Sequence, residues 1–230
     1  MSDTTDGCFI VAIDGPAGAG KSTTARLVAE RLGLRYLDSG ALYRTVALAA
    51  VERGVELDDG AAIAAVAAGI EVEVDAERGY VGLDGREVTS EIRSAAVSQA
   101  ASQVSAHAEV RAALVALQRD AARSPGTVAE GRDIGTVIFP DADLKVYLDA
   151  DPHERALRRA REMEAASATT TDNVDSVKRD MAERDRRDST RTVAPLAAAA
   201  DAMVVDSTHL AIDEVVECIV KEAQRRRCAG

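Results

Sequence analysis

The chain has 230 residues and 47% hydrophobic content, which is enough for one α/β domain, and its 3% aromatic content predicts an aliphatic core. A formal net charge of −11 argues against a nucleic-acid polymer as partner, because nothing offsets phosphate repulsion overall. No apolar run approaches the roughly 20 residues of a membrane helix, residues 1–7 show no signal-peptide pattern, and the three cysteines are scattered. We expect a cytoplasmic monomer that binds no membrane.

The first apolar run, Phe9–Ile13, leads into a glycine-rich loop and then into a helix expected over Lys21–Leu32. The loop fits G-x-x-x-x-G-K-[ST], a spacing at which backbone N–H groups point at the phosphates of a nucleotide. Lys21 is expected to supply a mobile charge for the β- and γ-phosphates, and the Ser22 hydroxyl a Mg²⁺ ligand. The predicted nucleotide-binding residues are Gly15, Pro16, Ala17, Gly18, Ala19, Gly20, Lys21, Ser22 and Thr23.

A second strand is expected at Leu34–Leu37, followed by another helix. Between Ala61 and Ser105 the pattern then changes to short alternating strands, with Asp84-Gly85 as a hairpin signal. We interpret residues 61–105 as an inserted, small, β-rich subdomain. Its strands are expected at Ile70–Val74, Tyr80–Leu83 and Glu87–Thr89.

The alternation of strands and helices resumes after the insertion. Asp151-Pro152 reads as the start of a helix, with Asp151 as its cap. Five apolar strands alternating with helices predict a P-loop α/β fold, a doubly wound five-stranded parallel sheet with the ligand at its carboxyl edge. The remaining expected elements are a helix near Ala108–Arg123, strands at Thr127–Glu130, Leu144–Leu148 and Met203–Val205, and a helix at about Ile212–Arg225.

Arginines follow the second and third predicted strands of the parallel sheet. Arg44 lies in the segment after Leu34–Leu37, and Arg132 follows Thr127–Glu130. Both are therefore expected at the sheet edge that carries the glycine-rich loop. A guanidinium group matches phosphate oxygens bidentately, which favours a second phosphate site there. The alternative is that both are ordinary surface arginines.

A third basic segment spans residues 152–191. Two arginine-rich helices joined by the polar run Ser167–Asp175, the best candidate for a mobile loop, suggest a helical lid that closes over phosphates. For any single residue, a solvated helix face with i,i+4 partners such as Glu154 and Arg158 is the alternative. The basic residues of the segment are Arg155, Arg158, Arg159, Arg161, Lys178, Arg179, Arg184, Arg186, Arg187 and Arg191.

Over essentially its whole length the chain resembles the bacterial cytidylate (CMP) kinases, members of the nucleoside monophosphate kinase family of P-loop proteins. The glycine-rich loop is common to many families, whereas the other segments, in their order, are much more specific. The matching segments are Ile13–Ser22, Leu37–Arg44, Glu91–Arg93, Ala101–Val104, Gly131–Val137, Arg184–Asp188 and Val193–Leu196.

This resemblance implies transfer of the γ-phosphoryl group of ATP to CMP or dCMP, with Mg²⁺ as cofactor. It implies that residues 1–230 form one kinase domain and that the insertion helps to bind CMP. In this reading Lys21, Arg132 and Arg191 are catalytic. Carried over by position, Arg44, Arg132 and Arg191 hold the CMP phosphate, Ser102, Arg111 and Asp133 read the cytosine edge, and Ser39, Arg184 and Asp188 lie near the sugar.

Two features leave alternatives open. Glu130 stands where an aspartate is common in related kinases, and its longer carboxylate could organise a Mg²⁺-bound water. Asp133 could orient Arg132 instead of reading the base.

Two other functions are compatible with the glycine-rich loop. One is a kinase for UMP, AMP or a metabolite, but such kinases would lack the long insertion. The other is a nucleotide-binding switch module, but the sequence contains no guanine-reading Asn-Lys-x-Asp segment.

Overall fold

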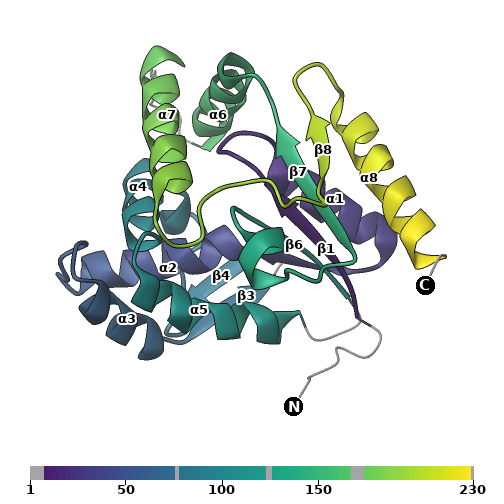
Figure 1. Ribbon diagram of the computed structural model, residues 1–230. Helices are drawn as coiled ribbons and strands as arrows, with labels where there is room; N and C mark the ends of the chain where they lie inside the picture. The colour runs from purple at the N-terminus through teal and green to yellow at the C-terminus, as the bar shows by residue number, and fades with distance from the viewer. Residues whose placement is uncertain (1–7, 76–77, 123–125, 167–173, 229–230) are drawn as a thin grey trace.

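The structure is a computed structural model that describes residues 8–75, 78–122, 126–166 and 174–228 (Figure 1). The run 167–175, predicted as a mobile loop, lies for the most part outside these residues. Among the described helices, none combines the length and the apolar character needed to cross a membrane.

Five parallel strands form the central sheet in the order β2-β6-β1-β7-β8. The predicted doubly wound parallel sheet is confirmed. Side chains of β1 alternate between two cores, with Val11 and Ile13 on one face and Ile10 and Ala12 on the other. Since β1 is the middle strand, its carboxyl end lies at the centre of the sheet edge. The strands are β1 (Phe9–Asp14), β2 (Arg35–Asp38), β6 (Gly126–Gly131), β7 (Leu144–Asp149) and β8 (Met203–Asp206).

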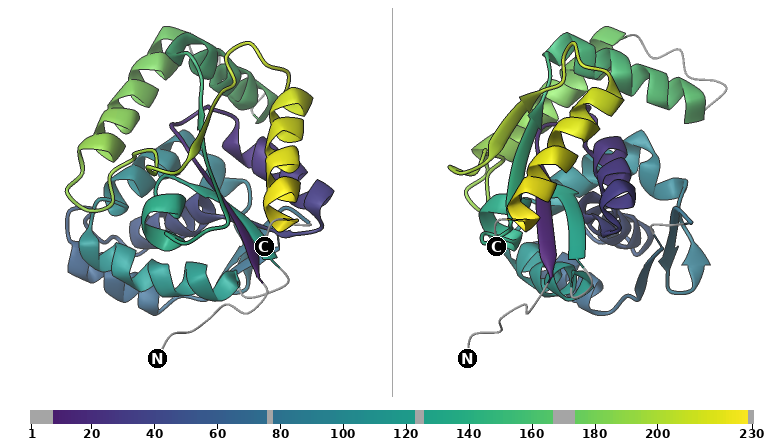
Figure 2. Two further views of the ribbon diagram at one scale, coloured as in Figure 1. Left: turned by 45° about the vertical axis from the view of Figure 1, so that its right-hand side comes forward. Right: turned by 90° about the vertical axis from the view of Figure 1, so that its right-hand side faces the viewer.

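Helices cover both faces of this sheet. On one face α1 (Lys21–Leu32) and α8 (Ile212–Arg227) share a core with β1, β6 and β7. On the other face the π-helical turn η2 (Ile134–Ile138) and α5 (Ala108–Ala121) pack against β1, β2 and β6. Figure 2 shows the sheet between these two layers. The π-helical turn falls in a segment expected to be an irregular loop.

The inserted segment contains the predicted hairpin as well as helices that the sequence analysis did not predict. Three antiparallel strands form a small sheet in the order β3-β4-β5. Asp84 (φ +50°) and Gly85 (φ +76°) make the expected two-residue turn. The insertion follows α2 (Ser39–Glu52), and its elements are α3 (Gly60–Ala68), β3 (Val72–Asp75), β4 (Tyr80–Leu83), β5 (Arg86–Glu87), η1 (Glu91–Arg93) and α4 (Ala95–Val104).

The third strand of the small sheet is shorter and earlier than the predicted Glu87–Thr89. Val88 still donates its N–H to Val81 O at 2.8 Å. Val81 N–H, however, donates to the Thr89 hydroxyl at 2.9 Å instead of to a main-chain carbonyl, so the regular ladder ends. Both α3 and α4 lie within residues 60–104, so the description of the insertion as β-rich fits only its middle.

Helices α6 (Pro152–Ala166) and α7 (Val174–Thr190) follow β7 and lie together above the carboxyl ends of β1 and β7 (Figures 1 and 2). The predicted start of α6 is confirmed: the Asp151 carboxylate accepts the His153 N–H at 2.8 Å, and Pro152 is the first helical residue. These two helices are the arginine-rich segment predicted as a lid.

Candidate functional site

The glycine-rich loop runs from the carboxyl end of β1 to the first residue of α1. Gly15 (φ +152°) and Gly18 (φ +71°) adopt backbone conformations that other residues rarely take. A Cβ at position 15 would lie 2.0 Å from the Leu148 carbonyl oxygen, so only glycine lets the loop press against β7. Gly20 precedes α1 and has no side chain to cap its first N–H groups. The positive end of α1 therefore faces the loop, which is the local geometry of an anion site.

Lys21 is the first residue of α1 and is almost fully buried, with 6% of its surface exposed. Its Nζ donates to Pro16 O at 2.8 Å, which folds the side chain back across the loop. Burial lowers the pKa of Lys21 to about 7, and the positive charge of Arg132 acts in the same direction. An ammonium group held in this way gains strongly from a nearby anion, as expected for a phosphate-binding lysine.

Ser22 and Glu130 place oxygen atoms next to the glycine-rich loop. The Ser22 hydroxyl donates to Glu130 Oε1 at 2.6 Å, and the Tyr36 hydroxyl donates to the same oxygen at 3.2 Å. Burial and, after it, the charge of Asp38 raise the pKa of Glu130. Among the described residues there is no cluster of three or more His, Cys, Asp or Glu side chains able to hold a metal alone. Mg²⁺ fits this site because it commonly uses one or two protein oxygens together with substrate phosphates and water.

Three guanidinium groups from different elements lie together in the cleft: Arg44 of α2, Arg132 after β6 and Arg184 of α7. Their carboxylate partners are few: Asp38 lies 2.8 Å from Arg44 Nη2, and Asp188 lies 3.1 Å from Arg132 Nε and 3.9 Å from Arg184 Nε. The Nε atoms of Arg44 and Arg184 are buried without a hydrogen-bond partner in the described structure. Burial and the Arg132 charge lower the pKa of Arg184 to about 10. We call these three residues the guanidinium cluster; its uncompensated charge fits an anion.

A second set of charges surrounds Asp133, which is 4% exposed. Its carboxylate forms ion pairs with Arg111 and, at 3.3 Å, with Arg191 Nη2. Arg191 also donates to Ala194 O at 2.6 Å and to the Ser105 hydroxyl at 3.4 Å. Arg132 pairs with Asp188 at 3.1 Å, so the described structure gives no support to the alternative in which Asp133 orients Arg132. Arg191, expected at the CMP phosphate, lies in this second set, whereas Arg184, expected near the sugar, lies in the guanidinium cluster.

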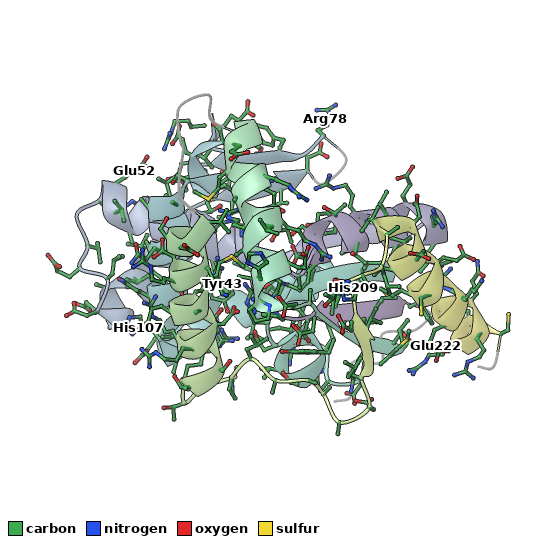
Figure 3. The ribbon with its side chains drawn as sticks, turned by 90° about the horizontal axis from the view of Figure 1, so that it is seen from above. Tyr43, Glu52, Arg78, His107, His209 and Glu222 are labelled. Atoms are coloured by element: carbon green, nitrogen blue, oxygen red, sulfur yellow. The ribbon has the colours of Figure 1, made fainter. Side chains whose placement is uncertain are left out.

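Tyr43 packs against Arg111. The Arg111 Cζ lies 5.5 Å from the centre of the Tyr43 ring, a cation–π contact, and both residues are buried. In Figure 3 the labelled Tyr43 lies inside the molecule, whereas Glu52, Arg78 and Glu222 lie at its periphery. Arg111 is thus fixed by a ring, a carboxylate and the Ser105 carbonyl oxygen, to which its Nη1 donates at 3.3 Å, which suits a group that reads a ligand edge.

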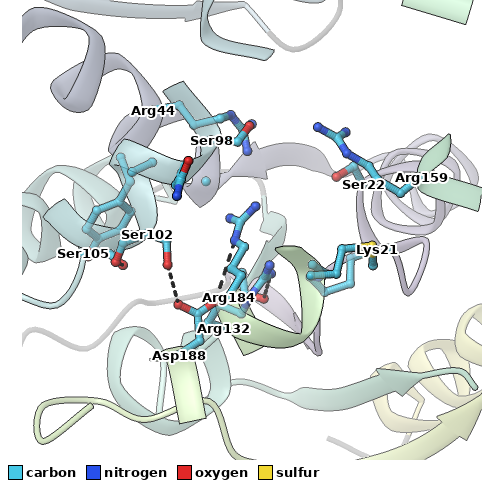
Figure 4. Close-up of a pocket in the computed structure, with 18 of the residues that line it drawn as sticks. Lys21, Ser22, Arg44, Ser98, Ser102, Ser105, Arg132, Arg159, Arg184 and Asp188 are labelled. Atoms are coloured by element: carbon cyan, nitrogen blue, oxygen red, sulfur yellow. Dashed lines mark hydrogen bonds and ion pairs between the residues drawn. The ribbon is translucent and has the colours of Figure 1, made fainter. Parts of the chain in front are cut away.

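The side of the cleft opposite Lys21 also contains the predicted serines. Ser102 of α4 donates to Asp188 Oδ1 at 3.5 Å and accepts from Arg187 Nη1 at 3.2 Å. Figure 4 shows Ser102 and Ser105 on one side of the pocket and Lys21 on the other. Ser39, at the start of α2, is 5% exposed and lines the same pocket. Polar groups from α4 therefore face the phosphate-binding loop across the cleft.

All of these groups line one cavity of about 370 Å³, a size typical of small-molecule sites. Every predicted substrate-binding residue lines it: Ser39, Arg44, Ser102, Arg111, Arg132, Asp133, Arg184, Asp188 and Arg191. Of the predicted nucleotide-binding residues, those that line it are Ala17, Gly18, Gly20, Lys21, Ser22 and Thr23, whereas Gly15, Pro16 and Ala19 form the back of the loop. Lining residues that the sequence analysis did not assign include Ser98, Gln99, Arg159 and Arg187.

Asp14 is a further residue of the site that the sequence analysis did not assign. Its carboxylate accepts the N–H groups of Ile134 and Gly135, each at 2.7 Å. Burial raises the pKa of Asp14 to about 6, and the two N–H groups oppose this shift. Asp14 thereby links the start of the glycine-rich loop to the segment after Asp133. The signal in the sequence was its place directly before the glycine-rich loop.

A phosphate-binding loop and a separate guanidinium cluster that line one cleft at the edge of a parallel sheet define a P-loop kinase. The sequence profile of the family described as cytidylate kinase matches residues 11–225. The chain belongs to the cytidylate kinase family, and the resemblance inferred from its motifs is confirmed.

Individual relatives are similar to this chain over nearly its full length. The "Cytidylate kinase" of Aeromonas salmonicida (strain A449) is 46% identical over 219 residues, which are 94% of each chain. That of Pelotomaculum thermopropionicum is 48% identical over 220 residues, covering 94% of this chain and 96% of its own. Among solved structures, shikimate kinase from Acinetobacter baumannii in complex with shikimate gives a TM-score of 0.47 at 13% identity, covering 96% of this chain and 95% of its own. That likeness is too weak to bear on the site.

Proposed function

We propose that this protein transfers the γ-phosphoryl group of ATP to CMP or dCMP, giving CDP or dCDP and ADP. The observation that carries the proposal is that one cavity contains two separate anion-binding surfaces, the loop ending in Lys21 and the guanidinium cluster. One surface suits the donor phosphates and the other an acceptor phosphate. Membership of the cytidylate kinase family supports the same donor and acceptor.

On the donor side, the N–H groups at the start of α1 and the Lys21 ammonium bind the β- and γ-phosphates. Ser22 would hold Mg²⁺, and Glu130, which already accepts a hydrogen bond from the Ser22 hydroxyl, would keep the hydroxyl lone pairs turned toward the ion. When bound, Mg²⁺ supplies positive charge to the phosphate oxygens as the bridging bond breaks.

On the acceptor side, the guanidinium cluster binds the CMP phosphate. We assign Arg184 to this phosphate together with Arg44 and Arg132, because its Nε is buried without a hydrogen-bond partner in the described structure and lies 3.9 Å from the carboxylate of Asp188. Arg191 already donates from Nε to Ala194 O, from Nη1 to Ser105 and from Nη2 to Asp133, so its predicted phosphate role would use the second N–H of Nη1 or Nη2. The inserted segment contributes Ser102 from α4.

Catalysis under this proposal is positional and electrostatic. The acceptor is itself a phosphate anion, so no strong general base is needed. Lys21 and Arg132 neutralise the charge that develops on the transferred group, and the cleft holds donor and acceptor in line. Helices α6 and α7 cover the loop and exclude water, which would otherwise accept the phosphoryl group.

Formation of ADP should depend on the acceptor. We expect rapid ADP release from ATP only when CMP or dCMP is present, measured in a coupled assay across CMP, dCMP, UMP and AMP. Rapid hydrolysis without an acceptor, unchanged by CMP, would instead identify an ATPase. Faster turnover with UMP or AMP than with CMP would assign the cleft to another acceptor, and nucleotide binding with no turnover would favour a switch module.

Asp133 should set the preference for cytosine. Its two oxygens are paired with Arg111 and Arg191, yet each oxygen has a second lone pair that can accept from the cytosine N4 amine. Uracil presents an acceptor at this position and is repelled. In Asp133→Asn the amide can also donate, so the ratio of kcat/KM for CMP to that for UMP should fall roughly tenfold or more, since one base-edge contact contributes ~1–3 kcal/mol. An equal loss for both substrates would show that Asp133 only positions its two arginines.

A further inference from the structure

Both main-chain groups of one glycine-rich-loop residue are bound by side chains of the lid helices. Ala17 N–H donates to Asp185 Oδ1 of α7 at 3.1 Å. Ala17 O accepts from Arg155 Nη1 of α6 at 2.9 Å. The middle of the loop is therefore held from outside the sheet, whereas Gly15 is held by β7 and Gly20 by α1.

The two side chains that bind Ala17 are also an ion pair with each other. Arg155 Nη1 lies 2.5 Å from Asp185 Oδ2, and the two side chains are only 11% and 17% exposed. Arg155 Nε also donates to Ala150 O, at the end of β7, at 3.1 Å. Arg155 is thus anchored to the sheet and to the loop, and Asp185 is the link that α7 adds. Removing one partner of an ion pair this buried costs much more folding free energy than removing one partner of a surface pair.

An apolar contact accompanies the ion pair. Ala17 shares a small core with Ala156 of α6 and with Val177 and Met181 of α7. A Cβ at Gly18 would lie 2.6 Å from Met181 Cε, so α7 touches the loop directly. These contacts are apolar and therefore non-directional. The directional element that orients α7 is the ion pair with its hydrogen bonds.

We infer that Arg155 and Asp185 are a pair of positioning residues that fix α7 on the glycine-rich loop and thereby place Arg184 opposite Lys21. Arg184 directly follows Glu183 and precedes Asp185 in the same helical turn, so a rotation of α7 that frees Asp185 moves the Arg184 guanidinium as well. The inference rests on the proposed function, because it concerns the alignment of donor and acceptor phosphates. Neither residue touches the reacting groups in this assignment.

Three variants separate charge from hydrogen bonding. Asp185→Asn removes the ion pair but keeps an oxygen for Ala17 N–H, and Asp185→Ala removes both. Asp201→Asn is the matched control, because Asp201 also pairs across elements, with Lys145 at 2.9 Å, and lies outside the cavity lining. We expect Asp185→Asn to lower kcat about tenfold or more, since small misplacements of reacting groups are costly. The ratio of ATP hydrolysis to phosphoryl transfer should rise, and Asp201→Asn should behave as the wild type.

Hydrogen–deuterium exchange provides a readout that does not depend on activity. In Asp185→Ala, peptides covering residues 14–20 and α7 should exchange faster, while those covering β1 and α8 should not change. The double variant Arg155→Gln/Asp185→Asn should have a kcat within about twofold of that of Arg155→Gln alone, because the effects of substitutions in one ion pair are not additive.

The outcomes distinguish this inference from the proposed function. If the wild type does not convert CMP, the proposed function fails, and the exchange experiment still tests the contact. If the wild type converts CMP while Asp185→Asn loses only thermal stability, with kcat, KM and the hydrolysis ratio unchanged, the pair is structural and the inference is overturned. Independent, multiplying losses in the double variant would also overturn it.

Discussion

Replacing Lys21 by alanine should lower kcat at least ~100-fold while the circular dichroism spectrum stays that of the wild type. Lys21 already lies across the loop, with Nζ bound to Pro16 O, and its pKa is lowered because burial penalises the charged form. A bound triphosphate restores the favourable environment of the ammonium, and the benefit grows as negative charge moves onto the transferred group. The loss should therefore fall on kcat and only weakly on the KM for ATP.

The matched control for this variant is Lys221→Ala. Lys221 lies on α8 and its side chain is 73% exposed, so the Lys221→Ala substitution removes the same charge without changing the cleft. Both variants should be assayed with saturating ATP and CMP. A folded Lys21→Ala protein with nearly normal kcat would show that Lys21 is not catalytic.

Replacing Arg132 by alanine should raise the KM for CMP far more than the KM for ATP. Arg132 donates from Nε to Asp188 and from Nη1 to Gly131 O at 3.3 Å, which leaves Nη2 and the second N–H of Nη1 for a phosphate. A hydrogen bond to a charged group contributes about 1.5–3 kcal/mol, which corresponds to a roughly 10- to 100-fold weaker interaction. Arg44→Ala should change the KM for CMP in the same direction, because Arg44 belongs to the same guanidinium cluster.

Arg186→Ala is the control for the loss of an arginine near the cleft. Its side chain is 65% exposed and pairs with Glu183 on the surface of α7. Steady-state kinetics with each substrate varied in turn would separate the effect on the KM for CMP from the effect on the KM for ATP. If Arg132→Ala raised the KM for ATP and left that for CMP unchanged, our division of the cleft into donor and acceptor sides would be reversed.

Most of the parallel sheet could be predicted from the sequence because its strands are short apolar runs separated by clear helix and turn signals. The inserted segment was harder. Helix α3 has the sequence GAAIAAVAA, which is apolar on all sides and therefore shows no helical period. Helix α4 does carry a helical pattern, with Val97, Ala100, Ala101 and Val104 buried after the Ser94 cap, and the neighbouring strand alternation hid it. The turn η2 depends on Asp14, 120 residues earlier in the chain, which no local pattern reveals.

The members of the site could be predicted, but their pairings could not. Residue types at strand ends indicated that Arg44, Arg132 and Asp133 would share a cleft. Which carboxylate pairs with which arginine depends on how α7 docks, and that is set by long-range contacts. Arg191 therefore lies with Asp133 and not in the guanidinium cluster. Its phosphate role remains a prediction.

The two hydrogen bonds from Ile134 and Gly135 to Asp14 make the donor and acceptor loops one rigid piece. The main chains of Lys21 and Arg132 are joined in this way through the sheet and Asp14. Two of the three guanidinium groups nevertheless depend on α7, because Arg184 belongs to this helix and Arg132 Nε donates to its Asp188. Under the proposed function, the positive charge around the acceptor phosphate is therefore complete only when α7 is docked on the loop, which is also the arrangement that excludes water.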